Sequence, residues 1–139
     1  ELTLHVGPGT FNAVESTDIR KHQMHSEFFN IEPSELKLLR ELKAGGRQVV
    51  AVGTTVVRVL ETLARGRYRR HSGWTDIFIH PPYTFRMVDG MLTNFHLPRS
   101  TLIMLVSAFC GRETIMKAYA SAIQERYRFF SYGDCMLIL

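Results

Sequence analysis

The sequence is poor in cysteine and in long apolar runs, and these shortages exclude several classes of protein. Its two cysteines, Cys110 and Cys135, form no CxxC pair, so we expect buried free thiols in a reducing cytosol and no disulfide framework. The longest apolar run, 102–110, is about half the length of a membrane-spanning helix. Residues 1–10 have neither the basic nor the apolar region of a signal peptide. We therefore predict a cytoplasmic protein that does not enter a membrane.

Familiar catalytic motifs are missing as well. The sequence has no GxSxG nucleophile motif and no phosphate-binding P-loop. Its net charge of +4 is compatible with a nucleic-acid partner but does not require one. The 139 residues suit one domain with a real core. The chain opens directly on a strand pattern, which we interpret as the start of a piece of a longer protein.

Hydrophobic periodicity predicts an α/β domain over residues 1–139, a layered sheet with flanking helices. Strands are expected at 2–6, 26–31, 49–52 and 77–79, and in a hairpin of 85–88 with 91–95 around Asp89-Gly90. Helices are expected at 33–43, 56–64, 100–110 and 112–126. The apolar run 49–52 is typical of a strand buried on both faces.

The densest set of polar groups is residues 93–101, TNFHLPRST, directly before the apolar helix. That helix is apolar enough to be buried, so it fixes the polar groups at its N-terminus, where unpaired N–H groups favour an anionic or electron-rich ligand. We expect His96 to face a pocket that it shares with Asn94 and Gly53-Thr54.

Two glycine turns follow predicted strands. Gly53-Thr54-Thr55 is either a place where a ligand approaches the backbone or a helix start capped by Thr54. Arg58, one turn into that helix, is either a ligand for a carboxylate or phosphate or a solvated side chain. The turn with Gly7, Gly9 and Thr10 is either a second ligand contact or a plain tight turn.

Histidine and arginine clusters offer further alternatives. His22 and His25 could chelate a metal with His96 or His5, although HxxH alone is an incomplete ligand set, and the alternative is one exposed and one hydrogen-bonded histidine. A basic stretch either follows a phosphate backbone or is a solvated loop, and its arginines are Arg65, Arg67, Arg69 and Arg70. Trp74 is either a stacking platform or, as we expect, a core residue.

Several segments together resemble the S-adenosylmethionine:tRNA ribosyltransferase-isomerases of queuosine biosynthesis. They occur in the order found in that family and cover nearly all of the chain: LTLHVGPGTF (2–11), HQMHSEFF (22–29), GGRQVVAVGTTVVRVLET (45–62), GWTDIFIHPPY (73–83), LTNFHLPRSTLIMLVSAFCG (92–111) and YRFFSYGDCML (127–137). The combination of TNFHLPRST with FFSYGD is specific to this family. The sequence departs from the family pattern at Pro8, Val56, Pro82 and Cys135.

The resemblance implies that the chain is the carboxy-terminal part of a larger two-domain enzyme whose β-barrel-like domain is absent here. Such an enzyme transfers the ribosyl unit of S-adenosylmethionine to 7-aminomethyl-7-deazaguanine in tRNA and isomerises it, which gives epoxyqueuosine. It needs no metal or redox cofactor. The implied partners are tRNA, S-adenosylmethionine, and either the missing amino-terminal half or a self-associated copy, with residues 2–6 as the exposed strand edge.

The resemblance also suggests roles for individual residues. Proton transfer falls to His96, His25 and His5, because an unperturbed imidazole titrates near neutrality. Asp134 would contact an amine or a hydroxyl. Ribose hydroxyls would bind to Thr93, Asn94 and Ser100. The methionine carboxylate would bind to Gly53, Thr54, Thr55 and Arg58, with Gly7, Gly9 and Thr10 as further substrate contacts. The alternatives are a non-catalytic fragment that retains ligand or partner binding, and a metal hydrolase using His22, His25 and His96.

Overall fold

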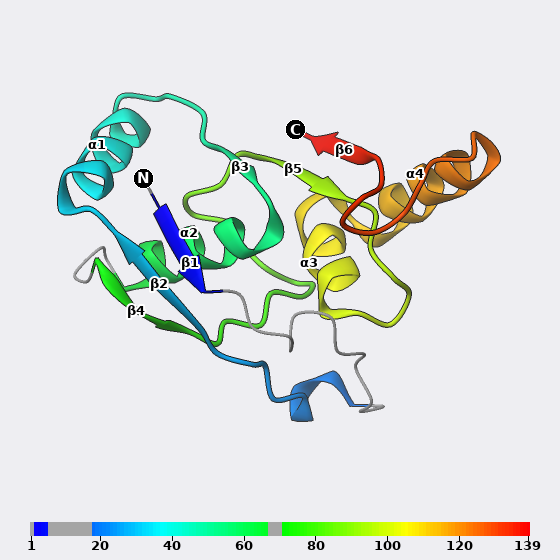
Figure 1. Ribbon diagram of the computed structural model, residues 1–139, viewed down its shortest axis with the longest axis horizontal. Coiled ribbons are helices and arrows are strands. Elements are labelled where there is room, and N and C mark those ends of the chain that lie inside the picture. The colour runs from blue at the N-terminus through cyan, green and yellow to red at the C-terminus, as the bar shows by residue number, and fades with distance from the viewer. Residues whose placement is uncertain (1, 6–17, 67–70) are drawn as a thin grey trace.

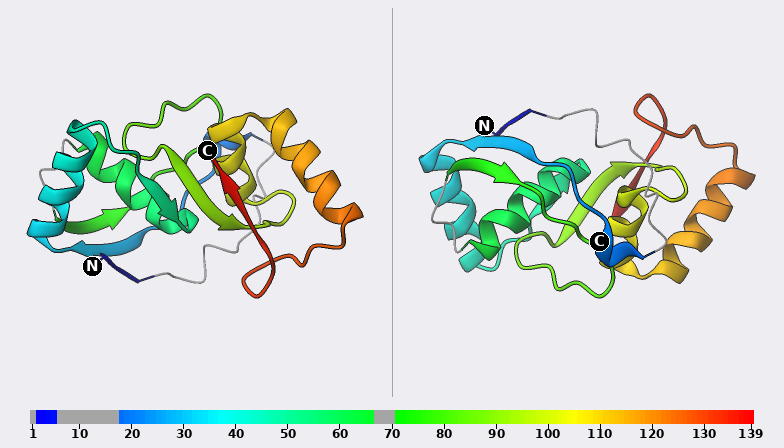
Figure 2. Two further views of the ribbon diagram at one scale, coloured as in Figure 1. Left: turned by 90° about the horizontal axis from the view of Figure 1, so that it is seen from above. Right: turned by 90° about the horizontal axis from the view of Figure 1, so that it is seen from below.

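The computed structural model describes residues 2–5, 18–66 and 71–139 and has an α/β fold with two small sheets (Figure 1). In chain order the elements are β1 (Leu2–His5), the 3-10 helix η2 (Ile19–Lys21), β2 (Glu27–Ile31), α1 (Pro33–Ala44), β3 (Val50–Val52), α2 (Thr54–Arg65), β4 (Ser72–Thr75), β5 (Gly90–Asn94), α3 (Thr101–Cys110), α4 (Arg112–Gln124) and β6 (Cys135–Ile138). The first sheet and α1 lie at one end of the molecule, and α3 and α4 lie at the other (Figure 2).

The first sheet is antiparallel, with strand order β1-β2-β4 and β1 at one edge. Phe29 and Ile31 of β2 face inward and pack against α1 and α2. On the outer face, the Phe28 ring lies 5.7 Å from that of His5 and 5.5 Å from that of Trp74. Trp74 is 68% exposed, so the expectation of a core tryptophan was wrong. Alternation along β4 turns Trp74 to the solvent face, because its neighbour Thr75 is buried.

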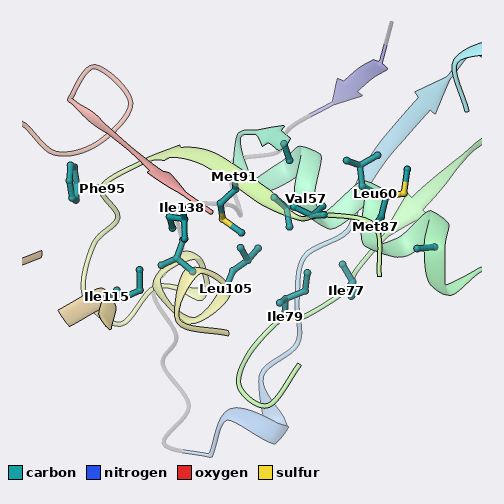
Figure 3. Close-up of a cluster of buried hydrophobic side chains, with 14 of the residues drawn as sticks. Val57, Leu60, Ile77, Ile79, Met87, Met91, Phe95, Leu105, Ile115 and Ile138 are labelled. Carbon is teal, nitrogen blue, oxygen red and sulfur yellow. The ribbon is translucent and has the colours of Figure 1, made fainter. Parts of the chain in front are cut away.

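The second sheet has strand order β3-β5-β6, with β3 parallel and β6 antiparallel to β5. Ala51 is the buried residue of β3, whereas Val50 and Val52 are 45% and 66% exposed. The expectation of a strand buried on both faces was therefore wrong, because only one face of this sheet lies on the core. That face contributes Met91 and Ile138 to a cluster with Val57 of α2 and Leu105 of α3 (Figure 3).

The predicted hairpin around Asp89-Gly90 does not form. Backbone N–H groups of Arg86, Met87 and Val88 donate to the buried carboxylate of Glu61, at 2.9 to 3.2 Å, so they are not free for a strand ladder. Asp89 binds Lys43 and the Val49 N–H, and β5 pairs with β3 and β6 instead.

The segment 77–79 is not a strand either. Ile77 and Ile79 are buried in the core cluster, but the segment forms no ladder within the described chain (Figure 3). The apolar pattern correctly predicted burial, and it wrongly predicted strand pairing.

The predicted helices are confirmed within a residue or two of their expected ends. Pro33 begins α1, and Ser100 caps α3 by accepting from the Ile103 N–H at 3.2 Å. Gly53, with φ 93°, occupies the N-cap position of α2, so the expected capping role of Thr54 was wrong. In the part of the chain that the structure describes, no helix combines the length and apolar character needed to cross a bilayer.

Candidate functional site

A cavity of about 310 Å³ lies where β3 and β5 end. Its walls come from the start of α2 (53–56), the end of β5 with the residues that follow it (93–97), the start of α3, Leu4 of β1, and Phe130-Ser131. The carboxyl ends of adjacent parallel strands are where ligands of open α/β sheets bind. The structure thus brings together the two polar segments, GTT and TNFH, that the sequence pointed to.

The first turn of α2 gives this cavity a positive wall. Thr54, Thr55 and Val56 line it, and their backbone N–H groups belong to the first turn, which has no intrahelical acceptors. The Gly53 N–H is used in a 2.8 Å bond to the Leu92 carbonyl, which fixes the turn against β5. The helix dipole adds partial positive charge at the same point, so this wall suits a carboxylate or phosphate.

His96, two residues after β5, lines the same cavity. Its Nε2 lies 3.0 Å from the Thr93 hydroxyl, and its backbone N–H donates to the Tyr119 hydroxyl at 2.7 Å. Burial lowers the pKa of His96 to about 4, so the imidazole is neutral at neutral pH. The expectation of an unperturbed imidazole is wrong for this residue, because only 9% of its surface stays exposed.

Asn94 and Ser100 also line the cavity, and each has a structural task. The Asn94 amide nitrogen donates to the carbonyls of Gly133 and Asp134 at 3.4 and 3.3 Å, which ties the 128–134 turn to the end of β5. The Ser100 hydroxyl caps α3 and donates to the Leu97 carbonyl at 2.8 Å. These bonds position the two side chains at the cavity wall.

Asp134 does not line the cavity. Its carboxylate accepts from the Arg128 N–H at 2.7 Å and contacts the Arg128 guanidinium at 3.5 Å. The backbone N–H of Arg128, followed by its guanidinium, lowers the pKa of Asp134. In this structure the carboxylate closes the turn 128–134.

Arg58 is buried, 1% exposed, and lies outside the cavity. Its guanidinium donates to the Glu27 carboxylate at 2.7 Å and to three backbone carbonyls, those of His25, Thr75 and Ile77, and it lies 3.1 Å from His25 Nε2. The oxygen acceptors take up four of the five guanidinium N–H donors, and His25 Nε2 lies within reach of the fifth. The geometry therefore does not support the predicted ligand role of Arg58, and the pair with Glu27 instead joins α2 to β2.

The other histidines are placed away from the cavity. His25 lies in the Arg58–Glu27 network, 3.3 Å from Glu27 Oε1, and His5 points to the outer face of the first sheet. The His22 ring packs on Phe78 at 5.1 Å. Over residues 2–5, 18–66 and 71–139, no three His, Cys, Asp or Glu side chains are grouped to hold a metal ion. The structure does not bring His22, His25 and His96 together.

The predicted RNA-contacting arginines are only partly described. The Arg65 guanidinium lies 4.7 Å above the Tyr83 ring. Arg67, Arg69 and Arg70 lie outside the described residues, as do Gly7, Gly9 and Thr10.

Sequence reasoning assigned no role to Leu4, Phe130 or Ser131, which all line the cavity. Phe130 and Ser131 belong to the FFSYGD segment, so the resemblance could have pointed to them. Leu4 offers no such signal, because an apolar strand residue reads as ordinary core.

Comparison with known proteins identifies the family of this chain. Residues 1–138 match the model of the family described as queuosine biosynthesis protein. The S-adenosylmethionine:tRNA ribosyltransferase-isomerase of Natranaerobius thermophilus is 57% identical over 99% of this chain and 41% of its own length. The enzyme of that name from Thermotoga petrophila is 54% identical over the whole chain and 42% of its own length.

A solved structure shares the fold. The crystal structure of an S-adenosylmethionine tRNA ribosyltransferase from Thermotoga maritima matches with a TM-score of 0.75 and 52% identity, over 81% of this chain and 40% of that one. The chain thus spans about two fifths of the length of the relatives that it matches. Sequence and fold agree, and the chain belongs to the queuosine biosynthesis protein family.

Proposed function

We propose that this chain supplies the S-adenosylmethionine-binding part of an S-adenosylmethionine:tRNA ribosyltransferase-isomerase. One observation carries the proposal: the cavity at the ends of β3 and β5 joins the GTT turn, the TNFH segment and the start of the apolar helix α3. In the proposed reaction, the ribosyl unit moves to 7-aminomethyl-7-deazaguanine in tRNA and rearranges to epoxyqueuosine, while adenine and methionine leave. A tRNA substrate implies a cytoplasmic protein.

The cavity suits the charges of S-adenosylmethionine. We assign the methionine carboxylate to the N-terminal turn of α2, where the N–H groups and the helix dipole favour an anion. Thr93 and Asn94, at the end of β5, lie within the same cavity and are assigned to the ribose hydroxyls. The sulfonium is a cation, so it favours a site in which the nearby histidine is uncharged.

His96 fits that requirement. As a neutral imidazole it offers a lone pair without repelling the sulfonium, so we assign it the removal of the proton beside the sulfur. The proton that His96 takes up leaves it as an imidazolium, so the same proton is available for the departing adenine. The Thr93 hydroxyl, 3.0 Å from Nε2, orients the ring.

The proposal is tested by two readouts, calorimetric binding of S-adenosylmethionine and release of adenine in the presence of tRNA that carries the 7-aminomethyl base. Thr93→Val removes the hydroxyl that orients His96 and keeps the side-chain shape, and we expect roughly a tenfold or greater loss of adenine release. Thr62→Val is the matched control, because it removes the hydroxyl that bonds Thr75 at 2.6 Å, outside the cavity.

The same assay separates catalysis from simple ligand binding. It is run with the chain alone and with the chain joined to the amino-terminal portion of a relative. Binding of S-adenosylmethionine without adenine release in both forms would favour a non-catalytic fragment. Absence of binding in both forms would refute the assignment of this cavity.

A further inference from the structure

The turn of residues 128–134, between α4 and β6, is closed by its own hydrogen bonds. The Asp134 N–H donates to the Arg128 carbonyl at 2.8 Å, and the Asp134 carboxylate accepts from the Arg128 N–H at 2.7 Å. The Gly133 N–H donates to the Phe130 carbonyl at 2.8 Å. A Cβ atom at Gly133 would lie 2.3 Å from the Arg128 carbonyl oxygen, so the turn has no room for a side chain there. These contacts fix the path of the backbone through the turn.

The same turn is fastened to the end of β5, and it holds Phe130 in an unusual conformation. The Phe130 N–H donates to the Phe95 carbonyl at 3.1 Å, next to the two bonds that the Asn94 amide makes to the turn. Phe130 has φ 70°, in the left-handed region that residues other than glycine rarely adopt. Backbone strain of this kind persists only where the surroundings fix it, and it is often found at ligand sites.

The side chain of Phe130 is available to a ligand. It lines the cavity at the ends of β3 and β5, and 47% of its surface is exposed. Its neighbour Phe129 packs on the rings of Phe95 and Tyr119, whereas Phe130 is in neither of the two buried clusters formed by the described residues. The fold therefore uses the backbone of Phe130 in the turn and leaves its ring at the wall of the cavity.

We propose that Phe130 is a substrate-binding residue whose ring stacks on the adenine of S-adenosylmethionine. This inference rests on the proposed function and deepens it, because the carboxylate and the ribose have assigned walls and the adenine has none. Leu4, Leu97 and Leu102 line the same cavity, and apolar and aromatic walls are typical of pockets for flat rings. An aromatic side chain stacks on a base through its π face. The strained turn thus sets the position of the ring before the ligand arrives.

The test compares two ligands on the full-length protein by calorimetry. One is S-adenosylmethionine, and the other is S-methylmethionine, which carries the same carboxylate, amine and sulfonium but lacks the adenosyl group. Phe130→Leu keeps an apolar side chain and removes the aromatic face. We expect it to raise the dissociation constant of S-adenosylmethionine by about 5- to 150-fold and to leave that of S-methylmethionine unchanged. Phe130→Tyr keeps the aromatic face and should restore wild-type binding.

Two further variants separate stacking from folding. Tyr132→Leu is the matched control, because Tyr132 belongs to the same turn, is 97% exposed and lies outside the cavity lining. It should bind both ligands as the wild type does. Phe130→Gly removes the ring from a backbone conformation that glycine adopts without strain. We therefore expect Phe130→Gly to lose affinity for S-adenosylmethionine as Phe130→Leu does, with a Tm no lower than that of Phe130→Leu.

Three outcomes would overturn the inference. Unchanged binding of S-adenosylmethionine in Phe130→Leu would mean that the adenine binds elsewhere, and the proposed function would stand because the wild type still binds this ligand. An equal loss for both ligands, or the same loss in Tyr132→Leu, would assign the effect to the shape of the turn. Failure of the wild-type protein to bind either ligand would refute the assignment of the cavity together with the role of Phe130.

Discussion

Replacing Arg58 by methionine tests whether this buried arginine holds the fold together or binds a ligand. The substitution keeps much of the apolar volume and removes all five guanidinium donors. It leaves the Glu27 carboxylate, 1% exposed, without the cation that lies 2.7 Å away in the wild type. Breaking a buried ion pair from one side costs about 3 to 5 kcal/mol. That is a large part of the 5 to 15 kcal/mol of a typical domain.

The assay is urea unfolding followed by far-ultraviolet circular dichroism, with the free energy of unfolding as the measured quantity. Glu27→Gln and the double variant complete a mutant cycle. We expect the double variant to be less destabilised than the sum of the two single variants by about 2 kcal/mol or more, because the second change removes the orphaned charge. Arg47→Met, at an exposed position, is the control and should stay within about 0.5 kcal/mol of the wild type.

The reasoning fails if the free energy of unfolding of Arg58→Met lies within about 1 kcal/mol of the wild-type value and the variant no longer binds S-adenosylmethionine. That result would return Arg58 to the ligand site. Retained binding with greatly reduced stability would establish the arginine as the link between β2 and α2.

Two further predictions concern buried titratable groups. The pKa of His96 is lowered from 6.5 to about 4, so the unfolded chain binds the proton more readily. The contribution of His96 to the free energy of unfolding is therefore fully present above pH 6.5 and is lost as the pH drops toward 4, a decrease of up to about 3 kcal/mol. We expect His96→Gln to flatten this part of the curve of stability against pH, measured by urea unfolding. Glu61→Ala removes the acceptor of the Arg86, Met87 and Val88 N–H groups, and we expect a loss of about 3 to 6 kcal/mol in the same assay. Glu113→Ala, an exposed glutamate, is its control, and equal losses at both positions would contradict the role of Glu61.

The parts of the structure that sequence predicted are those with local causes. Periodicity located α1, α3 and α4, and the apolar run of α3 identified a buried helix. The meeting of Gly53-Thr54 with His96 was also predictable, because both segments follow strands and the carboxyl ends of parallel strands lie side by side.

The errors have non-local causes. Asp89-Gly90 is a strong hairpin signal, but the amides before it bind Glu61, which lies 25 to 27 residues earlier in the sequence. Arg58 reads as a helix-surface residue, and its partner Glu27 is 31 residues away. Val52 is apolar and exposed, so hydrophobicity alone misplaced it. No window of neighbouring residues contains these partners.

The central place of β5 has a consequence for how the site opens. Hydrogen bonds run to β3 on one side and to β6 on the other, so neither edge of this strand can fray by itself. In native-state hydrogen exchange, its amides should exchange only through global unfolding, while the outer strands exchange through smaller openings. Met91 and Leu92, which are paired on both sides, therefore belong to the most slowly exchanging part of the chain. They anchor Thr93 and Asn94, whose ladder partners lie in β6, at the wall of the cavity.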